Sequence, residues 1–174
     1  MLRIAELAGH NLNWVQPDGF KMEYELLDGD TVAATLRFRS SFGSFATAES
    51  ADGIWTFKRV GFWQTSATVR ASGSDVDLAR FKNNTWSGGG TLEISNGRKY
   101  LANTNFWSTQ YDFKTETGEP LISYQKIGGL LHMGSNLKIN ASASGVAELP
   151  WMVPFGWYLT VMMYMDSAVV VAAT

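Results

Sequence analysis

The stretch that decides the fold is "LPWMVPFGWYLTVMMYMD", residues 149–166, the longest nearly uncharged apolar run in the chain. It either enters a membrane or is enclosed by the rest of the protein. As a helix it would be about 25 Å long, short of the ~30 Å hydrocarbon thickness of a bilayer, and Pro150 and Pro154 shorten its uninterrupted part. Extending the span would bury Asp166 at a cost of roughly 2.5 to 3.5 kcal/mol, and no Lys or Arg after Lys138 flanks it as an anchor. The run therefore favours a core helix, apolar on every side, over a membrane span.

The preceding chain, from residue 20 to about residue 141, has the alternating pattern of β-strands. In "FKMEYEL", residues 20–26, apolar side chains alternate with Lys and Glu. Asp52-Gly53 and Asn96-Gly97 are dipeptides that tolerate the positive φ of tight hairpin turns. About a dozen such strands follow one another, counting one in "MLRIAEL" at the start, with no linker or repeated motif. The sequence predicts one mainly antiparallel β domain over residues 1–174.

A barrel of about 12 strands has an interior of the size that one apolar helix would fill. A closed barrel of about 12 strands has a radius of about 11 Å, whereas eight strands give about 8 Å and fill their interior with their own side chains. A helix with its side chains is roughly 10 to 12 Å across, so it fits only the axis of the larger barrel. We therefore expect a closed antiparallel barrel of about 12 strands around a buried C-terminal helix at about residues 149–166, with no exposed sheet edge.

Three features of the sequence resemble a known family: the "LPWMVPFGWYLTVMM" helix, its "GWYL" segment and the residue pattern of "GRKYLANTNFWSTQYDF", residues 97–113. Over residues 20–166 the chain resembles the tubby C-terminal-like superfamily, in particular its LURP-one-related and phospholipid scramblase-like branch. The resemblance implies a 12-stranded barrel around a buried helix. In tubby proteins it also implies phosphoinositide binding through basic side chains on the outside of the barrel, and in scramblases a lipid-linked and calcium-linked activity.

Composition and motifs narrow the functional classes. The chain has 14 Lys and Arg against 16 Asp and Glu, a net charge of -2, so no overall basic field favours nucleic acid as a partner. It has no Cys, and its two His residues, His10 and His132, show no metal-ligand or catalytic spacing. The N-terminal sequence lacks the apolar segment of a signal peptide, so a cytoplasmic location is expected. We expect neither catalytic residues nor a metal or other cofactor.

Four basic residues are candidates for anion binding. Arg37 and Arg39 are two apart and share one outward strand face, with side chains about 6 to 7 Å apart, a spacing that suits adjacent phosphate oxygens. Lys58 and Arg59 would extend this basic face if their strand lies beside it. The arrangement is similar to the paired basic residues of tubby proteins. The leading hypothesis is a non-enzymatic module that docks reversibly, from the cytoplasm, to anionic phospholipid or phosphoinositide membranes.

Aromatic residues support an alternative hypothesis, a protein-interaction module with exposed aromatic loops. Three tryptophans stand near predicted turns and are the candidates for such a patch: Trp63, Trp86 and Trp107. Other aromatic residues are assigned to the core: Trp55, Phe57, Trp151, Phe155 and Trp157. A third possibility is a scramblase-like lipid-transfer activity or a small tail-anchored membrane protein.

Overall fold

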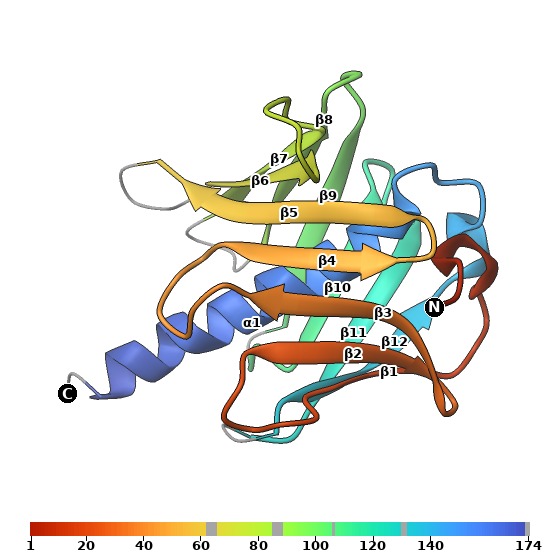
Figure 1. Ribbon diagram of the computed structural model, residues 1–174. Coiled ribbons are helices and arrows are strands. Elements are labelled where there is room, and N and C mark those ends of the chain that lie inside the picture. The colour runs from red at the N-terminus through yellow and green to blue at the C-terminus, as the bar shows by residue number, and fades with distance from the viewer. Residues whose placement is uncertain (62–65, 85–88, 106, 130–131, 173–174) are drawn as a thin grey trace.

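The computed structural model of the chain is a closed barrel of 12 antiparallel strands, filled by one C-terminal helix (Figure 1). It describes residues 1–61, 66–84, 89–105, 107–129 and 132–172. Each strand pairs with its neighbours in the sequence, and the first pairs with the last, so the sheet has no free edge. The strands are β1 (Leu12–Val15), β2 (Glu23–Asp28), β3 (Thr31–Phe38), β4 (Ala46–Ser50), β5 (Gly53–Val60), β6 (Ser66–Ala71), β7 (Ala79–Asn84), β8 (Gly89–Ile94), β9 (Lys99–Thr104), β10 (Gln110–Thr115), β11 (Pro120–Ile127) and β12 (Gly134–Ile139).

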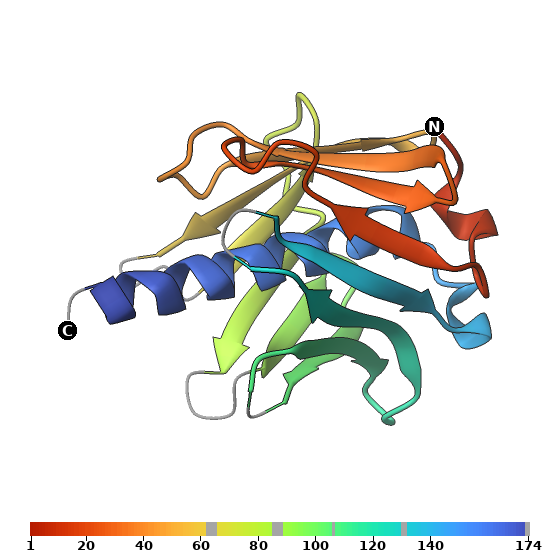
Figure 2. The same cartoon turned by 90° about the horizontal axis from the view of Figure 1, so that it is seen from below.

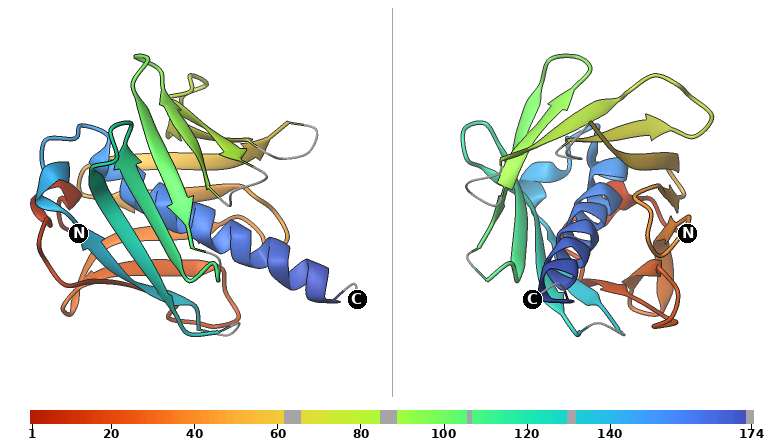
Figure 3. Two further views of the ribbon diagram at one scale, coloured as in Figure 1. Left: turned by 180° about the vertical axis from the view of Figure 1, so that it is seen from behind. Right: turned by 90° about the vertical axis from the view of Figure 1, so that its left-hand side faces the viewer.

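The helix α1 (Leu149–Ala172) enters the barrel at one end, runs through it and leaves at the other end (Figures 2 and 3). From Trp151 to Met162 every residue of α1 is buried. The side chains around it come from the inward positions of the strands, and the indole ring of Trp14 on β1 stacks on that of Trp157 with 6.1 Å between ring centroids. The expected core aromatics, Trp55, Phe57, Trp151, Phe155 and Trp157, are all buried. The predicted barrel around an axial apolar helix is confirmed.

Three local expectations differ from the structure. The helix continues to residue 172 instead of ending near residue 166, because no Gly or Pro follows to stop it. Residues Ile4–Glu6 form a 3-10 helix, η1, in place of the first strand, and β1 begins later, at Leu12. Phe20, expected on the buried face of a strand, is exposed in the loop before β2, where its backbone N–H donates to the side chain of Asp18 (3.0 Å).

The start of the helix is fixed by a buried carboxylate. Glu148 lies next to α1, and its side chain accepts hydrogen bonds from the guanidinium of Arg98 and the hydroxyl of Tyr100 (3.0 Å). Burial, and then the bond to Glu148, raise the pKa of Tyr100 to about 12. Further along, the hydroxyl of Tyr124 on β11 donates to the backbone carbonyl of Val153 (2.6 Å). These contacts fix the depth of α1 in the barrel.

Candidate functional site

The two ends of the barrel differ. The end at which α1 begins carries η1 and a second short 3-10 helix, η2 (Ala141–Ala143). The end at which α1 leaves, called here the mouth, faces left in Figure 1. Because the strands alternate in direction, every second connection lies at the mouth, including residues 16–22 between β1 and β2 and residues 39–45 between β3 and β4. These loops and the projecting end of α1 thus lie at the same end of the barrel.

Exposed aromatic side chains gather at the mouth. Among the described residues, the large aromatic side chains that are highly exposed are Phe42 (99%), Phe20 (88%) and Trp107 (77%). Each lies in a different mouth connection: β3–β4, β1–β2 and β9–β10. Val169, near the end of α1, is exposed at the same end. Exposed aromatic side chains in three connections of the same end make the mouth a candidate interaction surface.

Of the three tryptophans predicted to form an exposed patch, the structure places Trp107 at the mouth. Trp63 and Trp86 lie outside the described residues. Phe42 was missed by the sequence analysis, although "SSFGS", a lone Phe among Ser and Gly, is a composition typical of an exposed loop.

Basic residues lie beside these loops on the outside of the barrel. Arg37 is exposed on the outer face of β3, and Arg39 follows directly after the strand, with its guanidinium over the ring of Phe45 (5.6 Å to the centroid). The N–H of Arg39 donates to the carbonyl of Phe45 (2.9 Å), and the register of β4 with β5 continues this row to Lys58. Arg37, Arg39 and Lys58, called here the outer basic face, form no ion pair with any described carboxylate.

The strand of Lys58 does not lie directly beside that of the two arginines. Strand β4 separates β3 from β5, so Arg39 and Lys58 are about 9 to 10 Å apart across the sheet. A single phosphate is too small to bridge that distance, whereas a surface with several phosphates matches it.

Arg59 does not belong to the outer basic face. Consecutive residues of a strand point to opposite faces, so Arg59 points inward at the mouth. Its guanidinium makes two hydrogen bonds to the carboxylate of Asp166 on α1, at 2.9 and 2.6 Å. The nearby hydroxyl of Tyr158 donates to the carbonyl of Ser44 in the β3–β4 connection (2.8 Å). Arg59 thus ties the emerging helix to the barrel wall.

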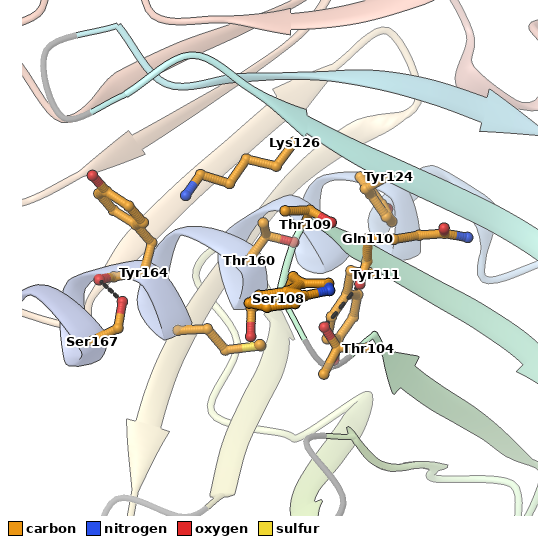
Figure 4. Close-up of a pocket in the computed structure, with 12 residues that line it drawn as sticks. Thr104, Ser108, Thr109, Gln110, Tyr111, Tyr124, Lys126, Thr160, Tyr164 and Ser167 are labelled. Atoms are coloured by element: carbon orange, nitrogen blue, oxygen red, sulfur yellow. Dashed lines mark hydrogen bonds between the residues drawn. The ribbon is translucent and has the colours of Figure 1, made fainter.

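A pocket opens at the mouth between α1 and strands β9 to β11 (Figure 4). Its volume is about 240 Å³. The ammonium of Lys126, near the end of β11, lies 3.7 Å from the centroid of the Tyr164 ring on α1. The other lining residues are Thr104, Trp107, Ser108, Thr109, Gln110, Tyr111, Tyr124, Thr160, Met163 and Ser167.

Lys126 has an unusual environment for a lysine. It occupies an inward position of β11, two residues after the buried Tyr124, and is only partly exposed. It has no described carboxylate partner. Burial lowers the pKa of its ammonium. The sequence signal for this residue was a charged side chain at an inward position of the alternating "LISYQKI" strand, which the sequence analysis overlooked.

The histidines do not meet in a common site. His10 contacts the carboxylate of Asp28 at 2.8 Å, and the ring of His132 contacts the carbonyl of Gln16 at 3.4 Å. Within the described ranges, no group of three or more His, Asp or Glu side chains lies together in a way that could hold a metal ion.

Fold and site together define a closed 12-stranded antiparallel barrel with an axial C-terminal helix and one end rich in aromatic and basic residues. No family model matches the chain, and no curated protein matches it. Among solved structures, it is similar to a protein from Arabidopsis thaliana, with a TM-score of 0.49 and 10% identity over 78% of this chain and 85% of that one. Nothing about the activity of this chain follows from that similarity.

Proposed function

We propose that this chain is a non-enzymatic module that docks reversibly, mouth first, onto membranes containing anionic phospholipid. The observation that carries the proposal is the presence of exposed aromatic side chains and of the outer basic face at the end of the barrel from which α1 emerges. Over the described residues, no helix has the length and apolar character needed to cross a membrane. The proposal is therefore attachment to a membrane surface.

The aromatic loops supply the apolar part of the attraction. Phe20, Phe42 and Trp107 are exposed in three separate connections at the mouth, so docking by the mouth would turn these connections toward the interfacial region of a bilayer. Complete burial of one such side chain contributes roughly 1.5 to 3 kcal/mol. Partial burial of the three aromatic side chains contributes less than the binding free energy of about 8 kcal/mol that micromolar affinity requires. The cations must therefore contribute the rest.

The outer basic face supplies the electrostatic part. Arg37 and Arg39 lie at the mouth end of β3, and Lys58 lies near the mouth end of β5. Each Lys or Arg close to an anionic leaflet contributes about 1 kcal/mol, an attraction that salt weakens. Together the two parts support binding that is specific for anionic membranes and reversible.

We also propose membership of the tubby C-terminal-like superfamily. A 12-stranded barrel closed around a C-terminal helix is the architecture that this resemblance implies, and it supports the assignment.

Vesicle co-sedimentation tests the docking proposal. We expect the protein to sediment with phosphatidylserine-containing and phosphoinositide-containing vesicles, to remain in solution with neutral vesicles, and to dissociate as salt rises. Phe42→Ser should weaken binding roughly five- to tenfold, and the double variant Arg37→Ala/Arg39→Ala, which removes about 2 kcal/mol, roughly thirtyfold.

Matched controls come from the opposite end of the barrel. Val76→Ser removes an exposed apolar side chain there, and Lys99→Ala/Lys114→Ala removes the same charge as the double arginine variant. Both should bind as the unmodified protein does. Equal losses in control and mouth variants, or no sedimentation with any vesicle, would refute mouth-first docking and favour a protein partner for the aromatic loops.

A further inference from the structure

The pocket at the mouth holds more hydrogen-bond donors than the protein itself satisfies. Lys126 carries an ammonium with three donor hydrogens, and its only interaction among the described residues is with the face of Tyr164. An aromatic face stabilises a cation without occupying those donors directionally. The donors of Lys126 are thus available to a ligand.

Tyr111 supplies a second unsatisfied donor. Its side chain lines the pocket and is 3% exposed, yet its hydroxyl forms no hydrogen bond with a described residue. Burial raises the pKa of this hydroxyl, which therefore remains a donor at all ordinary pH values. The Tyr111 hydroxyl is not among the fully enclosed atoms without a partner, so it opens to the pocket and can donate to an acceptor atom of a ligand there.

Some of the other pocket hydroxyls already donate within the protein, and at least one does not. Thr104, Thr160 and Ser167 donate to backbone carbonyls of Gln110, Gly156 and Tyr164, at 2.8, 2.9 and 2.8 Å, so their protons are already used. Thr109, by contrast, accepts a hydrogen bond from the side chain of Asn105 (2.8 Å), which leaves its own proton free to donate. Among the described residues, no Asp or Glu lines the pocket.

We propose that the mouth pocket binds a phosphate ester, with Lys126 as its counter-ion and Tyr111 and Thr109 as hydroxyl donors. A phosphate ester is rich in acceptor oxygens and negatively charged, which is the complement of a pocket with free donors and no carboxylate. The lowered pKa of Lys126 supports this assignment, because an anion beside the ammonium offsets the cost of burying its charge.

The size of the pocket limits the ligand. Sites for drug-sized molecules usually enclose about 300 to 1,000 Å³. The mouth pocket, at about 240 Å³, suits a small head group such as a phosphoglycerol. Since it opens at the mouth, the phosphate ester can belong either to a soluble compound or to a lipid. The proposal stands on the pocket alone and does not require docking.

Calorimetric titration tests the site with two probes. Glycerol 3-phosphate represents a soluble phosphate ester, and dihexanoyl phosphatidic acid, used below its micelle-forming concentration, represents a lipid; glycerol is the neutral control. We expect at least one phosphate probe to bind and glycerol not to bind. Lys126→Met, which keeps the apolar stem, should weaken binding roughly tenfold or more, and Tyr111→Phe about three- to tenfold.

Lys114→Met is the matched control, since it removes an unpaired lysine from the outside of the neighbouring strand β10, away from the pocket. It should bind as the unmodified protein does. Circular dichroism confirms that each variant is folded. Absence of binding up to about 10 mM, or equal binding by the Lys126→Met variant, would overturn the proposal. Binding of both probes indicates recognition of the phosphate alone; binding of the lipid probe only assigns the site to a lipid head group.

Phe42→Ser separates this site from membrane docking. The variant should lose vesicle binding while it retains titration with the phosphate probe. A pocket that binds the probe in a protein that ignores vesicles would leave the phosphate site standing and refute the docking, and the reverse result would do the opposite.

Discussion

At Gly156 the helix has no side chain because the ring of Tyr124 occupies that space. A Cβ atom built on Gly156 would lie 2.4 to 2.6 Å from three atoms of the Tyr124 ring and hydroxyl. The same hydroxyl donates to the carbonyl of Val153. This glycine lets β11 and α1 approach closely, and its lack of a side chain is part of the packing.

We expect Gly156→Ala to destabilise the protein, although Ala is normally favoured over Gly inside a helix by about 1 kcal/mol. Overpacking against Tyr124 and strain on its hydrogen bond should together cost about 2 kcal/mol net in the free energy of unfolding. Urea denaturation measures the change. Gly145→Ala is the control, since nothing lies within 4 Å of its Cβ position. A Gly156→Ala variant as stable as the unmodified protein would show that β11 and α1 separate easily.

The sequence predicts which face of a strand a basic residue occupies, but it does not predict which residues surround it. Strand alternation places Arg37 and Arg39 outward, as expected. The same alternation puts Lys58 and Arg59 on opposite faces of their strand, so the prediction that both extend the basic face was wrong for Arg59. The isolation of Lys126 from carboxylates depends on which elements surround it at the mouth. Such neighbours depend on register and closure, which one sequence does not reveal.

At the scale of elements, α1 is held by an ion pair at each end, and the two pairs differ in environment. Glu148, near the start of the helix, has a side chain only 7% exposed, whereas Asp166, near the mouth, is 60% exposed. A buried carboxylate left without its partner is costly. Asp166 is the exposed partner of its pair, and Asn in its place still offers an amide oxygen to Arg59, whose side chain is 15% exposed, so this change should cost less. The start of the helix should therefore be held much more firmly than its end.

Variants of the two pairs test this asymmetry. Arg98→Met should lower the free energy of unfolding by about 2 to 4 kcal/mol, because it leaves Glu148 buried with only the Tyr100 hydroxyl. Asp166→Asn should cost about 1 kcal/mol or less. Adding Glu148→Gln to Arg98→Met should recover part of the loss, since the charge is then absent. Equal costs at the two ends, measured by urea denaturation, would contradict this account.

The C-terminal end of α1 lies beyond the position predicted from the sequence. The apolar run ends at Asp166, so the sequence predicts a helix over about residues 149–166. In the structure the carboxylate of Asp166 pairs with Arg59, and the helix continues. Because the charge of Asp166 is compensated at the mouth, the residue can remain within the helix. The absence of Gly or Pro after Asp166 allows the helix to continue, and the ion pair with Arg59 makes the charge of Asp166 compatible with that path.

Over the whole molecule, the architecture could be predicted because two independent signals agreed. Period-two alternation gave the number of strands, and the length and composition of the apolar run required an enclosure of matching radius. Gly97, in one of the predicted hairpin turns, has a φ of 91°, as such a turn requires. Closure of β1 on β12 then follows from the need to surround α1 on every side.

Burial of tyrosine hydroxyls throughout the barrel makes the whole molecule sensitive to alkali. Five tyrosines have a raised pKa, in each case mainly through burial: Tyr24, Tyr100, Tyr111, Tyr124 and Tyr158. Because the folded pKa lies above the unfolded value near 10, their contribution to stability is complete below pH 10 and is lost as pH rises toward and past 12.

We expect cooperative unfolding between about pH 10.5 and 12. At pH 11 each buried tyrosine favours the unfolded state by about 1.4 kcal/mol, so five together approach the 5 to 15 kcal/mol stability of a typical domain. Tyrosinate absorbance and circular dichroism, followed in one titration, should change together, and Tyr111→Phe should move the midpoint to higher pH. Tyrosinate formation in a protein with native circular dichroism would show that water reaches these rings.

The axial position of α1 also sets the order of events during synthesis. All twelve strands precede residue 149, so the ribosome completes the entire wall before it begins the segment that fills it. Until then the inward side chains of the strands have only each other and water to contact. The inward faces of the strands therefore cannot be fully buried until α1 has been synthesised, and the arrival of this one helix completes the core.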